Sequence, residues 1–575
     1  MNKILKRSAA AAVSAMMLGI TTAVTTANTF PETAQAAPDE YHDDWLHVNE
    51  NAEIVDMNGN PVWLTGCNWF GYNVGSQVFD GVWSRNMHEM LNEIADHGFN
   101  LLRVPMSTEL LLQWKNGEPD PMIKINEWEN PELTLSGEVG GTPMYSFDIW
   151  NKAVEWCREN GMKIMIDIHS ASTSSSGHQV PLWYDSNYST EDWIEALTWF
   201  ADYYKDDDTI IAIDLKNEPH GKNDGQGMAK WDDSTDPTNW KYAAETCGKA
   251  ILDVNPELLI MVEGIEVYPK FENGSDWNSP AVDYAHYGDE SKQPYHGAWW
   301  GGNFRGEKDH PMDFGEYQSQ LVMSPHDYGP LVYNQTWFDK DFSRETLLED
   351  YWYDTWAYMV EENRHPLLMG EWGGFIDETH DPTGDNTKWM TILRDYMIEN
   401  RIHHTFWCFN ENSGDTGGLV YDNFGKWDED KYALVEPALW QDDNGRFISL
   451  DHARPLGQGG NGISISDYYG GSSQPETKAP TTAPATDVPT VQPTTPGADE
   501  IIYGDANDDG VIDIADATKI LQSIGNQDKY ALSEKGGLAS DVYENGGGIT
   551  AMDALVIQMY DAKIITVLPH EGALN

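Results

Sequence analysis

The segment Ile211–His220, "IAIDLKNEPH", begins as a short apolar run and ends in polar residues. The apolar run predicts a buried strand, and Pro219 stops it because proline has no backbone N–H to donate. Asn217 and Glu218 are therefore presented side by side where the strand ends. Either the chain simply leaves a sheet and becomes polar there, or the strand exists to aim these two side chains at something.

Similar apolar runs recur along the chain and alternate with longer amphipathic segments. The predicted strands start at Pro61, Phe99, Lys163, Ile210, Leu258, Gln320, Leu367 and His403. Eight alternations of strand and helix predict a parallel sheet closed into a (β/α)₈ TIM barrel. A doubly wound open sheet is the alternative. It is less favoured because polar residues follow nearly every strand, and not one switch point only.

Polar and aromatic side chains stand at the predicted strand ends. They are Asn68, Trp69, Arg103, His169, Asn217, Glu218, Glu263, His326, Tyr328, Glu371, Trp372 and Trp407. In a barrel, these ends converge on one mouth. So many polar groups are costly to desolvate unless they pair with one another or with a ligand. We expect a functional cleft there.

Two of these residues, Glu218 and Glu371, end the fourth and seventh strands and would face each other across the barrel. Paired carboxylates in one cleft are typical of glycoside hydrolysis, in which one gives a proton and the other attacks the anomeric carbon. We expect Arg103 to keep Glu371 ionised and Tyr328 to hydrogen-bond it. This chemistry needs no metal.

The motifs "LLRVP", "DLKNEPH", "SPHDYGP" and "MGEWGG" resemble the strand motifs of glycoside hydrolase family 5, retaining β-1,4-glycanases on a (β/α)₈ barrel. "GCNWFGYN" and "WWGGN" are similar to a bacterial endoglucanase branch, and the resemblance covers residues 44–448. It implies Glu218 as acid/base and Glu371 as nucleophile, with carboxyls about 5–5.5 Å apart. The family's remaining pattern is matched by Arg103, His169, Asn217, His326, Tyr328 and Trp407.

Substrate contacts are expected from this set. Asn217 would bind the 2-hydroxyl next to the reacting carbon, and Trp407 would form the floor beneath that sugar. His169 and His326 are expected to take part, whereas His220 is expected only to support the site. Candidate stacking platforms are Trp69, Trp183, Trp299, Trp300, Trp337 and Trp372, for each of which core packing is an equal alternative.

The substrate class stays open at this level. An endo-β-1,4-glucanase acting on cellulose or a related β-glucan is the first hypothesis. A mannanase, xyloglucanase or xylanase would use the same residues at the reacting bond. A barrel that binds carbohydrate without hydrolysing it is the third possibility, against which the intact pair of Glu218 and Glu371 argues.

The start of the chain predicts export. Residues 1–36 have a basic beginning, an apolar run and a small-x-small ending, as secretory signal peptides do. The run is too short for a comfortable membrane span, so we expect a secreted, extracellular protein. The formal net charge of -59 excludes nucleic acid and anionic membranes as partners. The four scattered cysteines are expected to be free and buried.

A change of composition divides the mature chain. Pro and Thr make up 13 of the 22 residues from Pro475 to Pro496, which predicts a stiff linker over residues 470–498. The catalytic domain is therefore assigned to residues 39–469 and a small domain to residues 499–575.

The small domain contains two similar acidic loops, each followed by a predicted apolar helix. The first supplies calcium-loop ligands at Asp505, Asn507, Asp509, Val511, Asp513 and Asp516, and the second at Asp541, Asn545 and Asp553. Aspartate at the last position departs from the EF-hand and resembles a dockerin, an all-α calcium-binding module. The second loop has Tyr543 at its third position and one inserted residue, which puts its calcium site in doubt.

A dockerin's partner is a cohesin module of a scaffoldin, so the resemblance implies membership of a cellulosome. Ile520, Leu521, Leu555 and Val556 are expected to divide between binding the partner and packing the two helices together.

Overall fold

The computed structural model divides the chain into two compact units, Met1–Pro475 and Glu476–Asn575. The division falls inside the predicted linker. The structure describes residues 43–118, 124–173, 177–225, 227–280, 293–470, 503–507, 512, 514–525, 531–543, 549–561, 565 and 567–569. The predicted signal peptide, residues 471–498 of the linker, Asp509, Val511, Asp513 and Asn545 lie outside this range.

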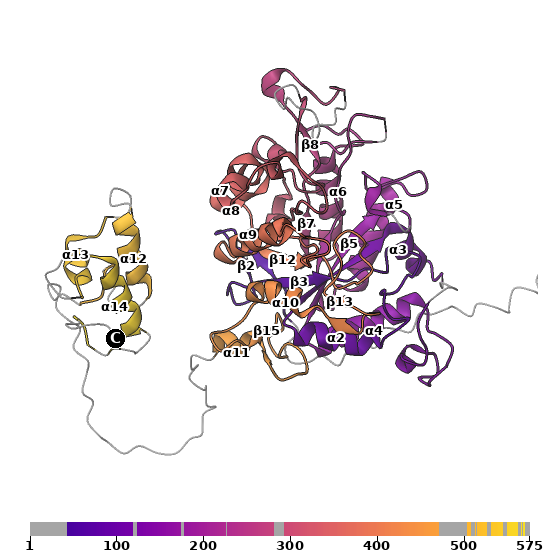
Figure 1. Cartoon of the computed structure of the whole chain (residues 1–575), viewed down its shortest axis with the longest axis horizontal. Coiled ribbons are helices and arrows are strands. Elements are labelled where there is room, and N and C mark those ends of the chain that lie inside the picture. Colours follow the sequence, from indigo (N-terminus) through magenta and orange to yellow (C-terminus); the bar gives the residue numbers. More distant parts are fainter. Residues whose placement is uncertain are drawn as a thin grey trace, which may run out of the picture. The chain divides into compact units, whose positions relative to one another are not determined.

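Eight parallel strands form the centre of the first unit (Figure 1). They are β3 (Thr65–Asn68), β4 (Leu101–Ser107), β5 (Lys163–Ser170), β6 (Ile210–Asp214), β7 (Leu259–Val262), β10 (Leu321–Met323), β11 (Leu368–Met369) and β12 (His403–Phe406). Their order is β10-β7-β6-β5-β4-β3-β12-β11. Parallel bridges from Met323 to Leu367 and from His326 to Glu371 join the two outer strands. The sheet therefore closes, and the predicted (β/α)₈ barrel is confirmed.

Helices lie around the outside of the strands (Figure 1). They are α2 (Met87–Asp96), α3 (Thr108–Lys115), α4 (Ser146–Glu159), α5 (Thr190–Tyr203), α6 (Trp240–Leu252), α7 (Arg344–Leu347), α8 (Tyr358–Glu361), α9 (Asp385–Glu399), α10 (Glu429–Val435) and α11 (Ile465–Gly470), with a π-helical stretch η8 (Leu348–Ala357) between α7 and α8. Local sequence sets their starts. Ser189 caps α5 in a reciprocal capping box with Asp192, which satisfies backbone N–H groups that the first turn leaves free.

The barrel interior changes from apolar to charged along four neighbouring strands, β4, β5, β6 and β7. Leu101, Met165, Ala212 and Met261 belong to one buried apolar cluster. Alternate residues of a strand point to the same side. The residues two positions further on are Arg103, Asp167, Asp214 and Glu263, and all four are fully buried. An apolar layer thus supports a charged layer directly beneath the mouth.

Short pairings complete the first unit. They are β1 (His47–Val48) with β2 (Ile54–Val55), β8 (Val267–Pro269) with β9 (Tyr295–Gly297), β13 (Val420–Tyr421) with β14 (Lys426–Trp427), and β15 (Phe447–Ile448) with β16 (Gly462–Ile463). All four cysteines are buried and unpaired, as predicted. In the second unit α12 (Ile514–Gly525), α13 (Glu534–Ser540) and α14 (Ala551–Asp561) are helices.

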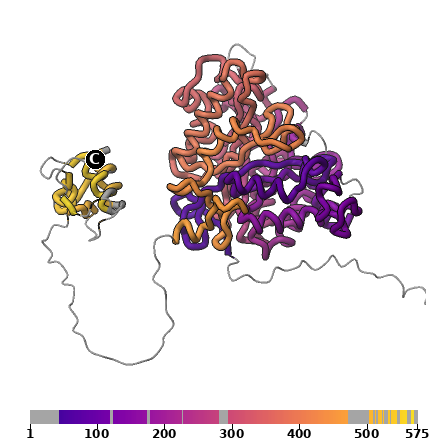
Figure 2. The backbone as a smooth tube through the Cα atoms, turned by 60° about the horizontal axis from the view of Figure 1, so that its bottom comes forward, coloured from indigo at the N-terminus to yellow at the C-terminus, as the bar shows by residue number. Residues whose placement is uncertain are grey.

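The first and last segments of the barrel unit lie side by side (Figure 2). The buried ammonium of Lys163, at the start of β5, contacts both of these segments. Its Nζ lies 2.6 Å from Oδ2 of Asp44 and 3.9 Å from Oδ2 of Asp451. Asp44 Oδ1 also accepts the backbone N–H of His452 at 3.0 Å. These charges have little access to water, so each depends on the others.

We predict that Lys163→Met lowers the free energy of unfolding of the barrel by about 3–5 kcal/mol, because it removes the buried ammonium that Asp44, Asp208 and Asp451 share. Urea denaturation followed by tryptophan fluorescence measures this. Lys205→Met is the matched control, since Lys205 pairs with Asp202 at the surface, and its effect should stay within about 0.5 kcal/mol. Equal losses for the two variants would contradict the assignment.

Candidate active site

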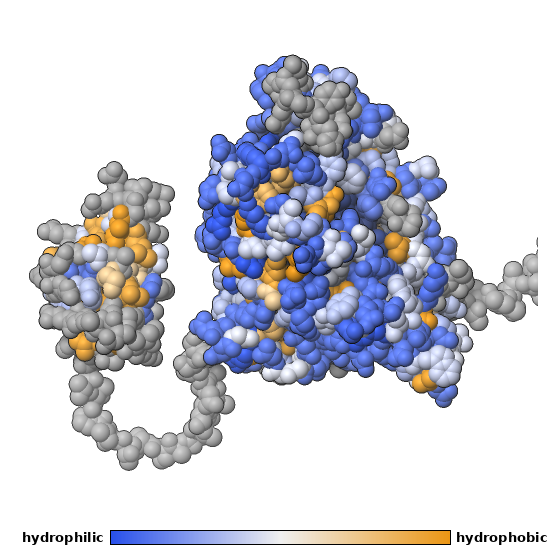
Figure 3. All heavy atoms as spheres, in the orientation of Figure 1, coloured by the Kyte–Doolittle hydropathy of each residue, from blue (hydrophilic) through white to orange (hydrophobic). Residues whose placement is uncertain are grey.

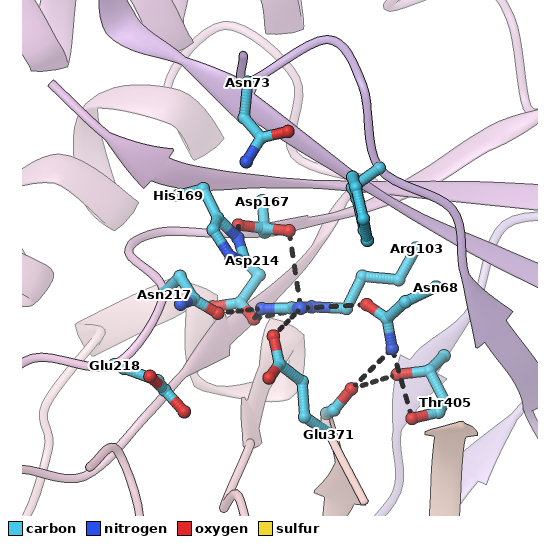
Figure 4. Close-up of polar contacts among 12 residues, drawn as sticks. Asn68, Asn73, Arg103, Asp167, His169, Asp214, Asn217, Glu218, Glu371 and Thr405 are labelled. Atoms are coloured by element: carbon cyan, nitrogen blue, oxygen red, sulfur yellow. Dashed lines mark hydrogen bonds and ion pairs between the residues drawn. The ribbon is translucent and has the colours of Figure 1, made fainter. Parts of the chain in front are cut away.

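The centre of the barrel mouth is occupied by Arg103, whose side chain is fully buried (Figure 4). Nη2 donates to Oδ2 of Asp214 at 2.9 Å and to Oδ1 of Asn217 at 3.0 Å. Nη1 donates to Oδ1 of Asn68 and to Oε1 of Glu371, each at 2.9 Å. A guanidinium is planar and stays protonated, so it fixes the directions of all these partners together.

Glu371 follows β11, and both of its carboxyl oxygens have strong donors. Oε1 receives Nη1 of Arg103, and Oε2 receives the hydroxyl of Tyr328 at 2.6 Å. The side chain is 3% exposed. Two donors leave the carboxylate no freedom to rotate while its open side faces the cleft.

Glu218 follows β6, which ends at Asp214, four residues earlier than the sequence predicted. The backbone N–H groups of Leu215 and Asn217 still donate to Met261 and Ile168 of the neighbouring strands. Glu218 itself has a φ of 51°, in the left-handed region. This conformation costs a non-glycine residue about 1–3 kcal/mol and persists only where its surroundings enforce it. The strain turns the Glu218 side chain into the mouth.

The two carboxyls lie close together. One oxygen of Glu218, one of Glu371 and a ring nitrogen of His326 are all within 4.8 Å of one another. Burial raises the pKa of both carboxyls. The charge of Glu371 raises the pKa of Glu218 further, whereas Arg103 and Tyr328 lower the pKa of Glu371. Glu218 therefore holds its proton when Glu371 has already lost its own.

A cleft of about 700 Å³ opens above these carboxyls. Its lining includes Phe70, Asn73, Asp80, His169, Asn217, Glu218, Glu266, Trp299, Trp300, Tyr328, Glu371, Trp407 and Asp415. Trp407 stacks between Phe70 and His169, with ring centroids 5.7 Å and 5.6 Å away. The cleft combines aromatic side chains with many polar and charged groups, which suits a ligand that offers both hydroxyl groups and apolar ring faces.

Comparison with known proteins identifies this arrangement. The cellulase family, glycosyl hydrolase family 5, matches residues 55–413. The chain belongs to this family. Endoglucanase G of Acetivibrio thermocellus is 50% identical over 523 residues, which are 88% of this chain and 89% of that protein. This share is larger than the first unit alone, so the similarity extends into the second.

Further relatives agree. An endoglucanase of Paenibacillus polymyxa is 36% identical over 391 residues, covering 68% of this chain and 86% of that protein. A solved structure of the hyperthermophilic endocellulase from the archaeon Pyrococcus horikoshii shares 32% identity at a TM-score of 0.57, covering 69% of this chain and 98% of that one. The chain is thus a family 5 glycoside hydrolase.

Most residues predicted from the sequence meet in the cleft of this family 5 enzyme. Those lining it are Glu218, Glu371, Asn217, His169, Tyr328 and Trp407. Arg103 and His326, predicted to bind substrate, are instead 0% exposed. Arg103 contacts the carboxyl of Glu371 and His326 contacts that of Glu218, both from below the cleft, so neither side chain reaches the cleft itself. His220 supports the site as predicted, because it stacks on Trp300 at 3.8 Å.

Two predicted substrate contacts are wrong. Trp69 is 0% exposed, stacks on Phe79 at 4.1 Å and donates its indole N–H to the carbonyl of Asp80. Trp372 is also 0% exposed and packs edge-on against Phe406. Both follow strands, but their rings turn outward between the strands and the surrounding helices, where apolar surface is buried. Trp183 and Trp337 likewise do not line the cleft, whereas Trp299 and Trp300 do.

Asp167 and Asp214 are not among the residues predicted for the site, and Glu263 is predicted only as one of the strand-end residues. Asp167 accepts from Nδ1 of His169 at 2.8 Å if that nitrogen is protonated, and so orients the ring. Asp214 holds Arg103, and Glu263 accepts the backbone N–H of Glu218 at 2.8 Å. An acid inside an apolar strand was the available signal, since such a residue is rarely buried without a partner.

We predict that Tyr328→Phe lowers kcat/KM about 10–100-fold, because a hydrogen bond to a charged group contributes about 1.5–3 kcal/mol. Loss of the hydroxyl raises the pKa of Glu371, so the acidic limb of the pH profile should move to higher pH. Tyr204→Phe is the control, because its buried hydroxyl donates to Asn151, away from the cleft. An unmoved acidic limb in Tyr328→Phe would contradict the role of Tyr328.

Proposed function

We propose that this protein is a secreted, retaining endo-β-1,4-glucanase that hydrolyses internal bonds of cellulose or related β-glucans. The names of its relatives support the substrate class: several are endoglucanases, and the solved structures include an endocellulase with cellotetraose. The family and the cleft account for hydrolysis of a glycosidic bond.

The separation of Glu218 and Glu371 is the observation that supports retention. Their nearest oxygens lie within 4.8 Å. Retaining enzymes need carboxyls about 5–5.5 Å apart, whereas inverting enzymes leave about 6.5–9.5 Å for a water molecule. A nearest-oxygen separation of at most 4.8 Å fits the shorter class, which supports direct attack of Glu371 on the anomeric carbon.

The reaction then proceeds by double displacement. Glu218 protonates the leaving oxygen while Glu371 forms the glycosyl–enzyme bond. Glu218 next takes a proton from the water that releases the sugar. Asn217 binds Arg103 through its oxygen, and among the described residues its Nδ2 has no acceptor. This amide is free to donate to the 2-hydroxyl, a contact that strengthens in the transition state.

We expect Glu371→Gln and Glu218→Gln each to lower kcat on cellotetraose by at least about 10³-fold, because each removes a group that takes part in bond making. Proton NMR of the first product formed by the native enzyme should show the β anomer, as retention requires. The α anomer would refute the double displacement.

Substrate choice is tested separately. Product analysis on carboxymethyl-cellulose, glucomannan, xyloglucan and xylan should show the largest kcat/KM on the cellulose derivative, with short oligosaccharides released from inside the chain. Activity on mannan with none on cellulose would refute the glucanase assignment while leaving the carboxyl pair in place.

Export is supported by the first residues and by one relative. A positive start, an apolar run and a small-x-small ending precede the barrel. The Xanthomonas campestris relative, 30% identical over 68% of this chain and 71% of its own length, is described as the major extracellular endoglucanase. In the parts of the chain that the structure describes, no helix is long and apolar enough to cross a membrane.

The second unit is proposed to be a dockerin that anchors the enzyme to a cellulosome scaffold. Its two helices α12 and α14 start alike: Asp516 and Asp553 each stand third in their helix and are fully buried. Asp516 accepts the N–H of Asn507, and Asp553 accepts the N–H groups of Val542 and Tyr543, at 2.8–3.0 Å. Both loops therefore fold back onto the aspartate that ends them, which supports a structural duplication.

Calcium is the proposed ligand of these loops. Carboxylates grouped at one loop suit a hard cation that prefers oxygen ligands, and Asp505 and Asp516 are both buried. When bound, calcium would neutralise these charges and fix the loop. Asp505, Asp516, Asp541 and Asp553 would contribute from the described residues.

The proposed partner is a cohesin, and the exposed helix surface suits it. Hydrophobic residues gather on the face of the second unit shown in Figure 3. Leu521 and Leu555 are 45% and 40% exposed, whereas Ile520 and Val556 are fully buried and pack the helices together. Ile520 and Val556 thus pack the helices, and Leu521 and Leu555 are the proposed partner-binding residues.

Calcium removal tests this division of labour. We expect EGTA to lower the melting temperature of the second unit and to leave kcat on cellotetraose unchanged, because the proposed calcium ligands all belong to the second unit. Calorimetry with and without added calcium measures the first effect. A parallel fall in hydrolysis would show that the barrel also depends on calcium.

A further inference from the structure

Glu218, Glu263 and His326 form a closed ring of three contacts. The backbone N–H of Glu218 donates to Oε2 of Glu263 at 2.8 Å. Oε1 of Glu263 lies 3.2 Å from Nε2 of His326. Nδ1 of His326 lies 3.1 Å from Oε1 of Glu218. Glu263 therefore contacts the backbone of Glu218 directly and is linked to its carboxyl through His326.

The Glu263 side chain is closely surrounded by other residues. It is fully buried, and the backbone oxygen of Glu263 accepts the indole N–H of Trp240 at 2.7 Å. Gly301 lies next to this carboxyl, and a Cβ at position 301 would stand 2.1 Å from Oε2 of Glu263. The absence of a side chain at this glycine makes room for the carboxyl. Its φ of 71° also favours glycine.

We propose that Glu263 is a positioning residue in its protonated, neutral form. It accepts the N–H of Glu218 through Oε2, which holds the left-handed turn. Its proton is placed on Oε1, 3.2 Å from Nε2 of His326, a buried nitrogen that has no other hydrogen-bond partner among the described residues. His326 must then carry its own proton on Nδ1, which it donates to Oε1 of Glu218. The acidic proton of Glu218 is left on Oε2, free for the leaving oxygen.

Charge supports the neutral form. Burial raises the pKa of Glu263 well above its ordinary value, and the neighbouring Asp214 raises it further. Burial also lowers the pKa of His326, so the ring is neutral and has one proton to place. Arg103 faces Asp167, Asp214 and Glu371, and its Nη2 also lies 3.4 Å from Oε1 of Glu263. One guanidinium is thus shared among four acids. The other buried cation that acts on Glu263 is Lys216, and burial lowers its pKa to about 8. A full negative charge on Glu263 would therefore be compensated only in part.

The test compares leaving groups, and it rests on the proposed role of Glu218. Dinitrophenolate leaves without a proton, whereas a sugar leaves only when Glu218 protonates it. Glu263→Met should therefore lower kcat/KM on cellotetraose about 10²-fold and change kcat/KM on 2,4-dinitrophenyl β-cellobioside by less than about threefold. Glu263→Gln places an amide N–H where the acid O–H was, so it should keep both values within about threefold of the native enzyme.

Two reference variants separate the possible failures. Glu218→Gln must show the same dependence on leaving group; if it does not, the proposed function fails. Glu307→Met is the matched control, because Glu307 is buried, accepts the N–H of Met312 and lies 3.1 Å from Nε2 of His365. It should destabilise the fold and leave the ratio of the two activities unchanged.

The remaining outcomes concern Glu263 alone. If Glu263→Met lowers both activities equally, the residue supports the fold and does not position the acid. If Glu263→Gln loses as much as Glu263→Met, the carboxyl acts in its charged form and the neutral assignment is overturned. Thermal melting of each variant confirms that the protein measured is folded.

Discussion

A single buried positive charge organises this enzyme. The guanidinium of Arg103 has no access to water, so its stability depends on the groups placed around it: Asp167, Asp214, Asn217 and Glu371 lie within 3.4 Å. Removing one partner would leave a charge uncompensated in a medium of low dielectric constant. Because these partners follow different strands, the barrel must close with the correct register for Arg103 to be satisfied. The site and the fold are therefore stabilised by the same contacts.

The same arrangement makes two chemically identical side chains different. Glu371 receives the guanidinium and the Tyr328 hydroxyl, which favour its charged form. Glu218 is removed from water by burial and faces the charge of Glu371, and both favour its protonated form. Neither environment comes from the segment that contains the residue. Placing acid and nucleophile a few ångströms apart is useful only because their surroundings separate their proton affinities.

Among the residues that line the cleft, the one with a left-handed backbone that a side chain disfavours is Glu218, the proposed proton donor. β6 ends at Asp214, but its hydrogen bonds continue through Asn217, so the sheet determines the position at which the chain turns. Glu218 then adopts a left-handed conformation, and its backbone N–H donates to the carboxyl of Glu263. The barrel strands restrain the position of this turn, and the residues that follow β6 direct the Glu218 side chain. Glycine at position 301 is part of this design, because any side chain there would displace the restraint.

The sequence by itself determined the barrel, the strand ends and the pair Glu218 and Glu371, because apolar periodicity and strand-end position are local properties of the chain. It could not assign the direction of each ring or the function of each buried acid. Trp69 and Trp407 both follow a strand, yet one turns into the core and the other lines the cleft. Likewise, Glu263 looked like any other strand-end acid. Only the tertiary structure decided these cases, since burial and hydrogen bonding depend on neighbours that are distant in sequence.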